Sequence, residues 1–196
     1  ADENLVVFEG LVVVVVSTGI DLVSNPAIKG LEGTQTQGAV ASLLTGVIAN
    51  DGWGNVEFLG LGPDNEFEVL LGTAFGDDFE GKRIDDAGVI AEQMECQLRG
   101  GQGADTLRAA EGDERWVSAD YLPDEDADGD GYGVTVDLVA QSGIDGWGAT
   151  DTLVNIGATR GSQFRDLLLG NDGDNWFRGE GGNDTFHGGE GVDLAS

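Results

Sequence analysis

Residues 161–196 divide without remainder into four consecutive units of nine residues, GSQFRDLLL, GNDGDNWFR, GEGGNDTFH and GGEGVDLAS. Glycine occupies position one of every unit, Asp or Asn occupies position six, and an apolar residue occupies position eight. A period this strict constrains the fold more than any other feature of the sequence. Each unit is too small to bury a core alone, so every repeat must form the same structure and pack on its neighbours.

Each nine-residue unit predicts a tight turn followed by a short strand. The first six positions are rich in Gly, Asn and Asp, which favour turns and tolerate positive φ. The last three positions form the strand, and alternation along a strand directs the side chain of position eight inward. With two units per coil, Phe177 and Phe186 would lie on opposite walls of one thin core. We therefore expect an all-β fold of stacked, parallel strands.

The same coil would stack the position-six side chains. Asp166 would lie above Asp184, and Asn175 above Asp193, eighteen residues further along. Two carboxylates about 4 Å apart repel each other by roughly 4 kcal/mol at an effective dielectric constant near 20. Calcium would remove this repulsion, because it accepts about six to eight oxygen ligands and glycine-rich turns expose backbone carbonyls beside the carboxylates. The repeats therefore predict calcium ions in the turns.

The composition limits the possible partners. Asp and Glu number 37 against 9 Lys and Arg, and the formal net charge is −28, so we expect neither a nucleic acid nor an anionic membrane as partner. The acids could instead form the solvated surface of a disordered or salt-adapted chain, but strand-sized apolar runs such as Leu11–Val16 argue against disorder. That run is too short to span a bilayer, and no transmembrane segment is predicted. A single Cys96 and a single His187 exclude a zinc site with the usual four ligands.

The closing segment resembles the RTX (repeats-in-toxin) calcium-binding nonapeptide, G-G-x-G-x-D-x-U-x, in which U is a large apolar residue. The resemblance is strong over residues 170–196 and weaker over 161–169, where Gln163, Phe164 and Arg165 replace the glycine-containing triplet. It implies a right-handed parallel β-roll or β-helix that holds several Ca²⁺ ions in successive turns. It also implies an extracellular or cell-surface protein, exported by Gram-negative type I secretion.

The resemblance further implies which residues bind the metal. They are the turn residues Gly170, Asp172, Gly173, Gly179, Gly181, Gly188 and Gly191, and the acidic residues Asp166, Asp184 and Asp193. Asn175 departs from the pattern and would be a neutral ligand. A flexible tail rich in Gly and Asp is the alternative interpretation, but such tails lack an apolar residue at every ninth position.

Degenerate copies of the unit occur upstream. They place aspartate at position six three times: Asp105 in residues 100–108, Asp77 in residues 72–80 and Asp86 in residues 81–89. Counting by nine from Leu107 predicts that Leu98 and Trp116 also face inward. Residues 85–99 fit a helix and a distorted coil of the roll equally well, so both remain open.

A longer repeat surrounds these copies. Residues 38–60 align with residues 133–157, and the tetrapeptide DGWG occurs in both segments. The chain therefore divides into a strand-rich start or cap (1–37), a degenerate unit (38–118), an acidic linker (119–132), and lead-in strands with nonapeptides (133–196). The sequence ends on the last residue of a nonapeptide, so we expect further chain beyond it.

The acidic linker contains a second calcium pattern, D-x-D-x-D-G followed by an acid six residues later. Its candidate ligands are Asp126, Asp128, Asp130, the carbonyl of Tyr132, and Asp137. Gly133 stands where an apolar residue usually lies, and neither flank reads as a helix. The pattern therefore predicts a bare Asp loop rather than an EF-hand. A solvated acidic linker is the alternative.

Together these features favour a calcium-dependent folding module without catalytic activity. His187 lies at position nine of a nonapeptide with no nucleophile motif beside it, and the paired carboxylates have the spacing of metal ligands. Two alternatives use the same module. One is an accessory module of an exported hydrolase, lyase or epimerase whose catalytic domain lies elsewhere. The other is a surface-layer or adhesin unit that contacts protein partners or polysaccharide, with Trp53 and Trp147 as candidate sugar contacts.

Overall fold

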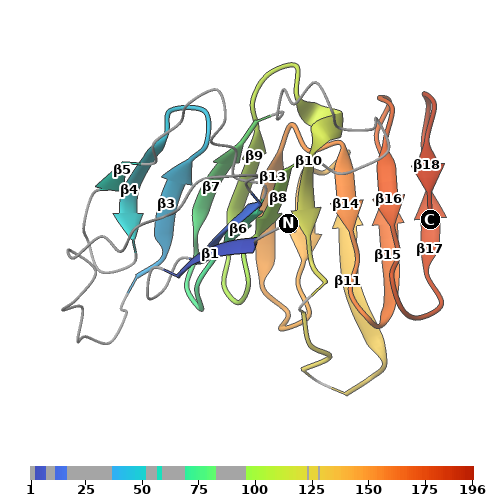
Figure 1. The fold of residues 1–196 in the computed structure, drawn as a ribbon. Coiled ribbons are helices and arrows are strands. Elements are labelled where there is room, and N and C mark those ends of the chain that lie inside the picture. The colour runs from blue at the N-terminus through green and yellow to red at the C-terminus, as the bar shows by residue number, and fades with distance from the viewer. Residues whose placement is uncertain are drawn as a thin grey trace.

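The computed structural model describes residues 3–7, 12–16, 37–51, 57–58, 69–82, 96–122, 124–127 and 129–196 (Figure 1). In these ranges the strands form two sheets, so the expected all-β class is confirmed. Sheet A runs β1 (Glu3–Val7), β2 (Val12–Val16), β6 (Val69–Leu71), β8 (Cys96–Arg99), β10 (Val117–Asp120), β14 (Ala158–Arg160), β16 (Trp176–Arg178) and β18 (Leu194–Ala195). Sheet B runs β17 (Thr185–His187), β15 (Arg165–Leu169), β11 (Tyr132–Asp137), β12 (Ser142–Ile144), β13 (Thr150–Val154), β9 (Thr106–Ala109), β7 (Asp78–Gly81), β3 (Ala39–Ser42), β4 (Val47–Asp51) and β5 (Glu57–Phe58).

The nonapeptide strands alternate between the two sheets. Each strand from β14 to β16 pairs in parallel with the strand two places later, so that β14, β16 and β18 continue sheet A while β15 and β17 continue sheet B. Three register pairs fix the period: Ala158 with Trp176, Leu167 with Thr185, and Trp176 with Leu194. Each pair is eighteen residues apart, so two nonapeptides complete one coil, as predicted.

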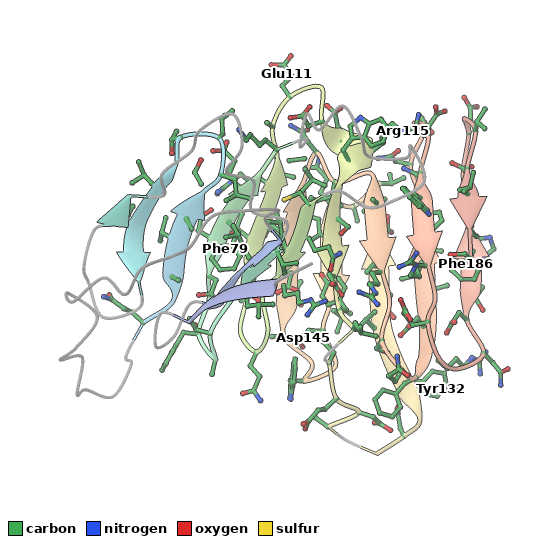
Figure 2. The ribbon with its side chains drawn as sticks, viewed as in Figure 1. Phe79, Glu111, Arg115, Tyr132, Asp145 and Phe186 are labelled. Atoms are coloured by element: carbon green, nitrogen blue, oxygen red, sulfur yellow. The ribbon has the colours of Figure 1, made fainter. Side chains whose placement is uncertain are left out.

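The core lies between the sheets, and the position-eight residues of the first three terminal nonapeptides contribute to it, whereas Ala195 of the last unit is exposed. Leu168 and Phe177 are buried, and Phe186 packs against the same core (Figure 2). Phe177 on β16 and Phe186 on β17 face each other across the two sheets, with ring centroids 6.1 Å apart and planes tilted by 40°. The upstream position-eight residues Phe79 and Leu107 are also fully buried. The predicted thin core is therefore confirmed.

The upstream coils are longer than eighteen residues, and one predicted core residue is wrong for that reason. Leu98 is buried on β8, but its partner on β10 is Ala119, twenty-one residues later. Trp116 instead lies in the 3₁₀ helix η2 (Glu114–Trp116), half-buried beneath the Arg115 guanidinium, whose carbon is 4.9 Å from the ring centroid. The turn before β10 takes up three extra residues, which moves Trp116 out of the inward position.

The two segments related by the longer repeat have similar local folds. In residues 38–60, β3, β4 and β5 pair antiparallel in sequence order. In residues 133–157, β11, β12 and β13 do the same. The segment 85–99 was left open between a helix and a distorted coil, and its last four residues, Cys96–Arg99, form strand β8 of sheet A and not a helix. Asp86 lies outside the described residues.

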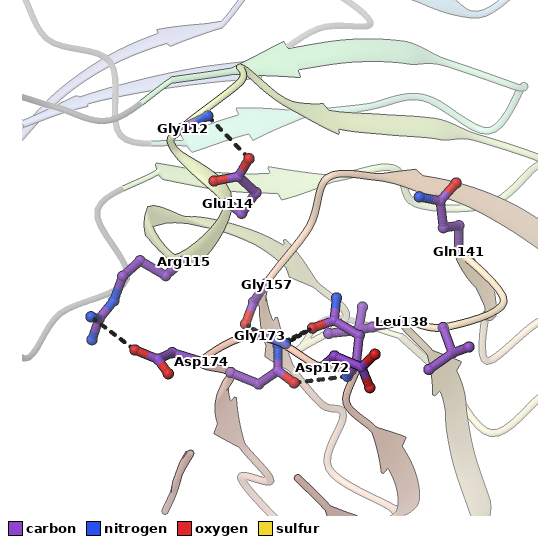
Figure 3. Close-up of a pocket in the computed structure, with 12 residues that line it drawn as sticks. Gly112, Glu114, Arg115, Leu138, Gln141, Gly157, Asp172, Gly173 and Asp174 are labelled. Atoms are coloured by element: carbon purple, nitrogen blue, oxygen red, sulfur yellow. Dashed lines mark hydrogen bonds and ion pairs between the residues drawn. The ribbon is translucent and has the colours of Figure 1, made fainter. Parts of the chain in front are cut away.

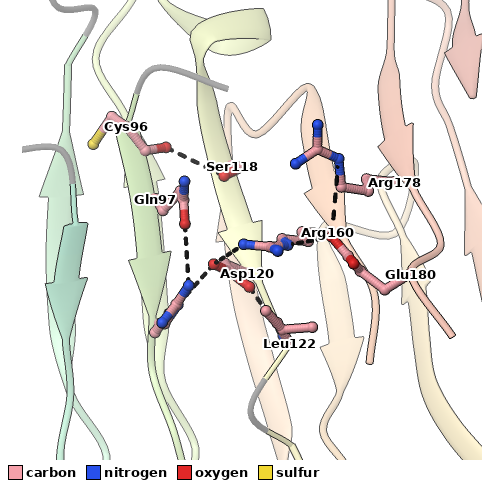
Figure 4. A network of polar contacts seen from close by, with 9 residues as sticks. Cys96, Gln97, Ser118, Asp120, Leu122, Arg160, Arg178 and Glu180 are labelled. Atoms are coloured by element: carbon pink, nitrogen blue, oxygen red, sulfur yellow. Dashed lines mark hydrogen bonds and ion pairs between the residues drawn. The ribbon is translucent and has the colours of Figure 1, made fainter. Parts of the chain in front are cut away.

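A chain of ion pairs crosses one face of sheet A (Figure 4). Asp120 on β10 is buried, and its Oδ2 lies 2.7 Å from Arg99 Nε on β8 and 3.7 Å from Arg160 Nη1 on β14. The Arg160 Nε in turn lies 2.6 Å from Glu180 Oε1, which is 3.9 Å from Arg178 Nε. These contacts join four neighbouring strands of the sheet through their side chains.

Candidate metal-binding turns

Position-six side chains form ladders that join one coil to the next. The backbone N–H of Asp166 donates to Asp184 Oδ1 at 3.1 Å, and the N–H of Asn175 donates to Asp193 Oδ1 at 2.9 Å. Upstream, the N–H of Asp77 donates to Asp105 Oδ1 at 2.8 Å. Each acid thus reaches back to the same position in the neighbouring coil. The predicted stacking of these residues is present.

The upstream ladder continues to an aspartate that the sequence interpretation missed. The backbone N–H of Asp105 donates to Asp151 Oδ1 at 2.9 Å, and the Tyr121 hydroxyl donates to Asp151 Oδ2 at 3.0 Å. Leu153 on β13 lies in register with Leu107 on β9. The sequence does contain a pattern that relates Asp151 to Asp105, because the tripeptide Asp-Thr-Leu occurs at both 105–107 and 151–153.

Burial makes negative charge unfavourable along this ladder. Loss of solvent raises the pKa of Asp77 to about 6, of Asp105 to about 8 and of Asp151 to about 6, despite the backbone N–H groups that oppose the shift. Burial also raises the pKa of Asp166, and the charge of Asp184 adds to this rise. The ladder therefore favours protonated carboxyls or a compensating cation.

Three of the turns are closed by the side chain at position two, and we call them closed turns: 72–77, 161–166 and 170–175. In turn 161–166, the Ser162 N–H donates to Asp166 Oδ2 and the Ser162 hydroxyl donates to Asp166 Oδ1, both at 2.8 Å. The same hydroxyl oxygen accepts the Phe164 N–H at 3.1 Å. Turn 72–77 repeats this pattern with Thr73, whose N–H donates to Asp77 Oδ2 at 2.7 Å.

The closed turn 170–175 uses two amides (Figure 3). The Asn171 N–H donates to Asn175 Oδ1 at 2.8 Å, and Asn175 Nδ2 donates to Asn171 Oδ1 at 3.1 Å. Asn171 Oδ1 also accepts the Gly173 N–H at 2.9 Å. Asp172 is exposed on the rim of a groove of about 660 Å³, and Gly170 begins the turn in a buried position. The neutral side chain of Asn175 therefore has a full set of partners.

The other three turns, 100–105, 179–184 and 188–193, lack this closure, and we call them open turns. Their backbone is left-handed at positions two and four, with φ of +85° and +121° at Gly101 and Gly103, +67° and +108° at Glu180 and Gly182, and +98° and +100° at Gly189 and Gly191. Asp105 Oδ2 is buried without any hydrogen-bond partner. Among the described residues, no hydrogen bond reaches Oδ2 of Asp184 or Asp193 either. Each open turn therefore holds one unused carboxylate oxygen.

Each open turn stacks on a closed turn whose carbonyl oxygens face it. A Cβ atom on Gly101 would collide with the Thr73 carbonyl oxygen, and one on Gly182 with the Phe164 carbonyl oxygen. The same holds for Gly191 and the carbonyl oxygen of Gly173. The remaining predicted turn glycines belong to these open turns: Gly179 and Gly181 in the second, and Gly188 in the third. Carbonyl oxygens of the closed turns thus lie against the backbone of the open turns, each of which also holds an unused carboxylate oxygen.

The acidic linker forms a tight loop around Asp126. Its carboxylate accepts the backbone N–H groups of Gly129 at 2.8 Å, Asp130 at 3.1 Å and Gly131 at 2.9 Å. Gly131 has a φ of +82°, which favours glycine at this point of the loop. The structure therefore brings Asp126 and Asp130 into one loop.

The last predicted ligand of the linker lies elsewhere. Asp137 ends strand β11, which begins at Tyr132, and five extended residues span roughly 16 Å. Its Oδ1 accepts the Ala140 N–H at 2.9 Å and closes the turn that follows the strand. The structure does not bring Asp137 to the loop, and Asp128 lies outside the described residues.

A second acidic group missed by the sequence interpretation surrounds the DGWG loop at 145–148. Asp145 Oδ1 accepts the N–H groups of Trp147 at 3.0 Å and Ala149 at 2.6 Å, while its Oδ2 is buried without a partner. Asp124 Oδ2 accepts the Gly146 N–H at 3.0 Å, and burial raises the Asp124 pKa to about 7. These contacts hold the linker against the loop.

The side chains available as metal ligands limit how a cation could bind. Within the described ranges, no three His, Cys, Asp or Glu side chains form a group that could hold a metal ion. An open turn supplies one carboxylate, so a cation there would take most of its ligands from carbonyl oxygens.

His187 is exposed on β17. No helix among the described residues is long and apolar enough to cross a bilayer.

Comparison with protein families identifies the repeats. A family model for the RTX calcium-binding nonapeptide repeat matches the chain in four copies, over residues 97–115 and 160–195. All three open turns lie inside these ranges. No curated protein matches the chain significantly. Residues 97–115 and 160–195 are therefore similar to the RTX calcium-binding nonapeptide repeat.

Proposed function

We propose that this protein is a calcium-dependent folding module of a secreted or cell-surface protein, and that its coils form a right-handed parallel β-roll. The alternation of strands between two sheets every nine residues supports the roll, and the general handedness of parallel crossovers supports its right hand. The observation that carries the function is the unused oxygen of each open turn, above all the buried Asp105 Oδ2 without a partner.

The chemistry of the open turns fits calcium. Carboxylate and carbonyl oxygens are the ligands that Ca²⁺ prefers, whereas the softer nitrogen and sulfur ligands of zinc are absent from these turns. Asp105, Asp184 and Asp193 would hold the ions through Oδ2, together with carbonyl oxygens of the stacked closed turns. The bound cation would supply the positive charge that the buried ladder lacks.

The module would use this binding to make folding depend on calcium. A ligand that binds only the folded state stabilises it by RT ln(1 + [Ca]/Kd), about 2.7 kcal/mol at a hundredfold excess over Kd for each site. Several ions would together decide whether the chain folds. In a calcium-poor cytosol the charge of −28 would keep the chain expanded and fit for type I export. Outside the cell it would fold.

The division into a cap (1–37), a degenerate unit (38–118), a linker (119–132) and a terminal repeat unit (133–196) is part of the same proposal. The module is not catalytic in this proposal. It would serve either as the accessory part of an exported enzyme or as a structural unit of an extracellular assembly.

Circular dichroism with and without calcium tests the proposal. We expect a β-sheet spectrum in millimolar calcium, and a large loss of that signal in excess chelator, restored by calcium but not by an equal concentration of magnesium. Magnesium is the control because it demands short, octahedral coordination and keeps its water. A β spectrum that stays unchanged in excess chelator contradicts the proposal.

A second candidate function is contact with a saccharide. Trp147 and the exposed Tyr132 line a cavity of about 330 Å³ together with Asp130 and Asp145, and aromatic faces with nearby carboxylates suit sugar rings. Trp53 lies outside the described residues. A glycan array with the folded protein and with Trp147→Ala tests this. Binding that the substitution abolishes supports the contact, and no binding to any saccharide retires it.

A further inference from the structure

We propose that a Ser, Thr or Asn side chain at position two replaces calcium in the closed turns. These three turns would close without metal and form the template on which the open turns bind their ions. This inference rests on the proposed function of the open turns. It assigns calcium to Asp105, Asp184 and Asp193, and withdraws it from Asp77, Asp166 and Asn175.

The hydrogen bonds of Asp166 show what the replacement does. Its Oδ1 accepts the N–H of Val134 at 2.8 Å and the hydroxyl of Ser162 at 2.8 Å, while its Oδ2 accepts the Ser162 N–H at 2.8 Å. Three donors thus point their hydrogens at this carboxylate. The same hydrogens would repel a cation placed there, and a metal could bind only after displacing them. The hydrogen-bond donors of this turn already compensate the negative charge of Asp166, which is the role that a bound metal would have.

The closed turn at Asn171 and Asn175 excludes calcium more strongly. It contains no carboxylate at position six, and the Asn175 oxygen and nitrogen are both used, the latter by Asn171 Oδ1 at 3.1 Å and the Gly157 carbonyl at 3.4 Å. A hard divalent ion gains most from charged ligands. This turn offers it only a neutral oxygen that is already bonded.

The backbone separates the two kinds of turn in the same way. Thr73, Ser162 and Asn171 keep negative φ, which aims the position-two N–H at the position-six side chain. The open turns have positive φ at this position, and their position-six Oδ2 receives no such N–H. The side chain at position two therefore decides both the turn conformation and whether an oxygen is left for a metal.

The pairing of turns suggests an order of events. Turn 72–77 stacks on 100–105, turn 161–166 on 179–184, and turn 170–175 on 188–193, so each pair contains one closed and one open turn. A closed turn that forms without calcium would hold its carbonyl oxygens in place for the ion that the open turn binds.

A matched pair of substitutions tests the assignment. Asp166→Asn and Asp184→Asn remove the same charge from the same ladder, one coil apart, and Asn175 shows that the fold accepts Asn at this position in a closed turn. Bound calcium per folded chain is measured by equilibrium dialysis with atomic absorption. We expect Asp184→Asn to lose one ion and Asp166→Asn to lose none. If Asp166→Asn also loses an ion, the inference is wrong.

A gain of binding provides the second measurement, at saturating calcium. Ser162→Gly combined with Phe164→Gly converts turn 161–166 to the open pattern, and we expect one additional ion per chain. Gln163→Gly, at position three of the same turn, is the control and adds none. If the double variant does not fold, the comparison of Asp166→Asn with Asp184→Asn decides, because only the variant of the open turn is expected to lose an ion. A wild-type chain that binds no calcium refutes the proposed function itself. Wild-type stoichiometry in Asp184→Asn refutes the proposed placement of the ions in the open turns, and wild-type stoichiometry in a folded double variant refutes only the inference.

Discussion

At the scale of single residues, positions two and six of each closed turn have matched chemistry. A hydroxyl at Thr73 or Ser162 donates to an aspartate at position six, whereas the amide of Asn171 meets the amide of Asn175. The difference follows from the donors that are available. A hydroxyl can give its hydrogen to a carboxylate while its oxygen accepts a backbone N–H. The Asn171 oxygen already accepts an N–H, so its partner must be a donor.

This matching predicts that Asn175→Asp destabilises the protein. A carboxylate would face the Asn171 oxygen, and turning the Asn171 amide over would supply a donor only by removing the acceptor of the Gly173 N–H. We expect a loss of about 1–3 kcal/mol in the free energy of unfolding, the usual cost of an unsatisfied buried polar group. Urea unfolding in saturating calcium measures it. Asp172→Asn, an exposed change in the same turn, should leave stability nearly unaltered, and an Asn175→Asp variant as stable as the wild type would contradict this account.

At the scale of strands and turns, sheet A carries its own charge compensation apart from any metal. Asp120 is buried between Arg99 and Arg160 on the neighbouring strands, so three strands share one carboxylate. An exposed pair, Arg108 with Asp78, joins β9 and β7 on sheet B. Burial distinguishes the two, because solvent screens the exposed pair and not the buried one.

We therefore expect the substitutions Asp120→Asn and Asp78→Asn to differ sharply. Asp120→Asn leaves two guanidinium groups without their counter-charge, and its cost should lie near the lower end of the roughly 3–5 kcal/mol for breaking a buried pair. Asp78→Asn should cost less than about 1 kcal/mol. Thermal and urea unfolding of both variants in saturating calcium gives the comparison. Equal losses would show that burial does not govern these pairs.

At the scale of the whole molecule, buried acids link folding to pH. Burial raises the pKa of Asp124 to about 7, of Asp151 to about 6 and of Asp105 to about 8, all above the 3.8 of the unfolded chain. The folded state therefore holds more protons than the unfolded state between about pH 4 and pH 8. Stability must fall as pH rises through this window, and each unit of raised pKa corresponds to about 1.4 kcal/mol at most.

We predict that the metal-free protein is more stable at pH 5 than at pH 8. The β-sheet circular dichroism signal that remains in chelator should be larger at pH 5 than at pH 8, and saturating calcium should remove this drop because a bound cation takes over the role of the protons. The control is the same pair of measurements on Asp124→Asn. A smaller difference between pH 5 and pH 8 in this variant would show that Asp124 carries part of the pH dependence. A β-sheet signal in chelator that grows from pH 5 to pH 8 would contradict the sign of these shifts.

The sequence predicted what depends on the nine-residue period and missed what depends on tertiary distance. The inward position of Phe177 and the stacking of Asp166 on Asp184 follow from counting, because the coils of 158–196 have a constant length. Trp116 was misplaced because three extra residues enter an upstream coil. Asp151 joins a ladder through a partner 46 residues away, so counting by nine does not reach it, although both residues begin the tripeptide Asp-Thr-Leu.

The role of position two was hidden for a different reason. Ser162 and Asn171 appear as departures from the repeat consensus when the sequence is considered alone. Their backbone N–H groups donate to the position-six side chains, and these hydrogen bonds can be recognised only in the folded turn. They depend on the backbone angle φ at position two, which the sequence alone does not give.

The two kinds of turn suggest how substitutions would change the number of bound ions. Because glycine and serine differ by little in size and have codons one base apart, one or two exchanges within a turn would add or remove an ion while chain length and strand register stay the same. Under the proposed function, the calcium concentration at which the chain folds depends on the number of open turns, and substitutions at position two would therefore change it without rebuilding the fold.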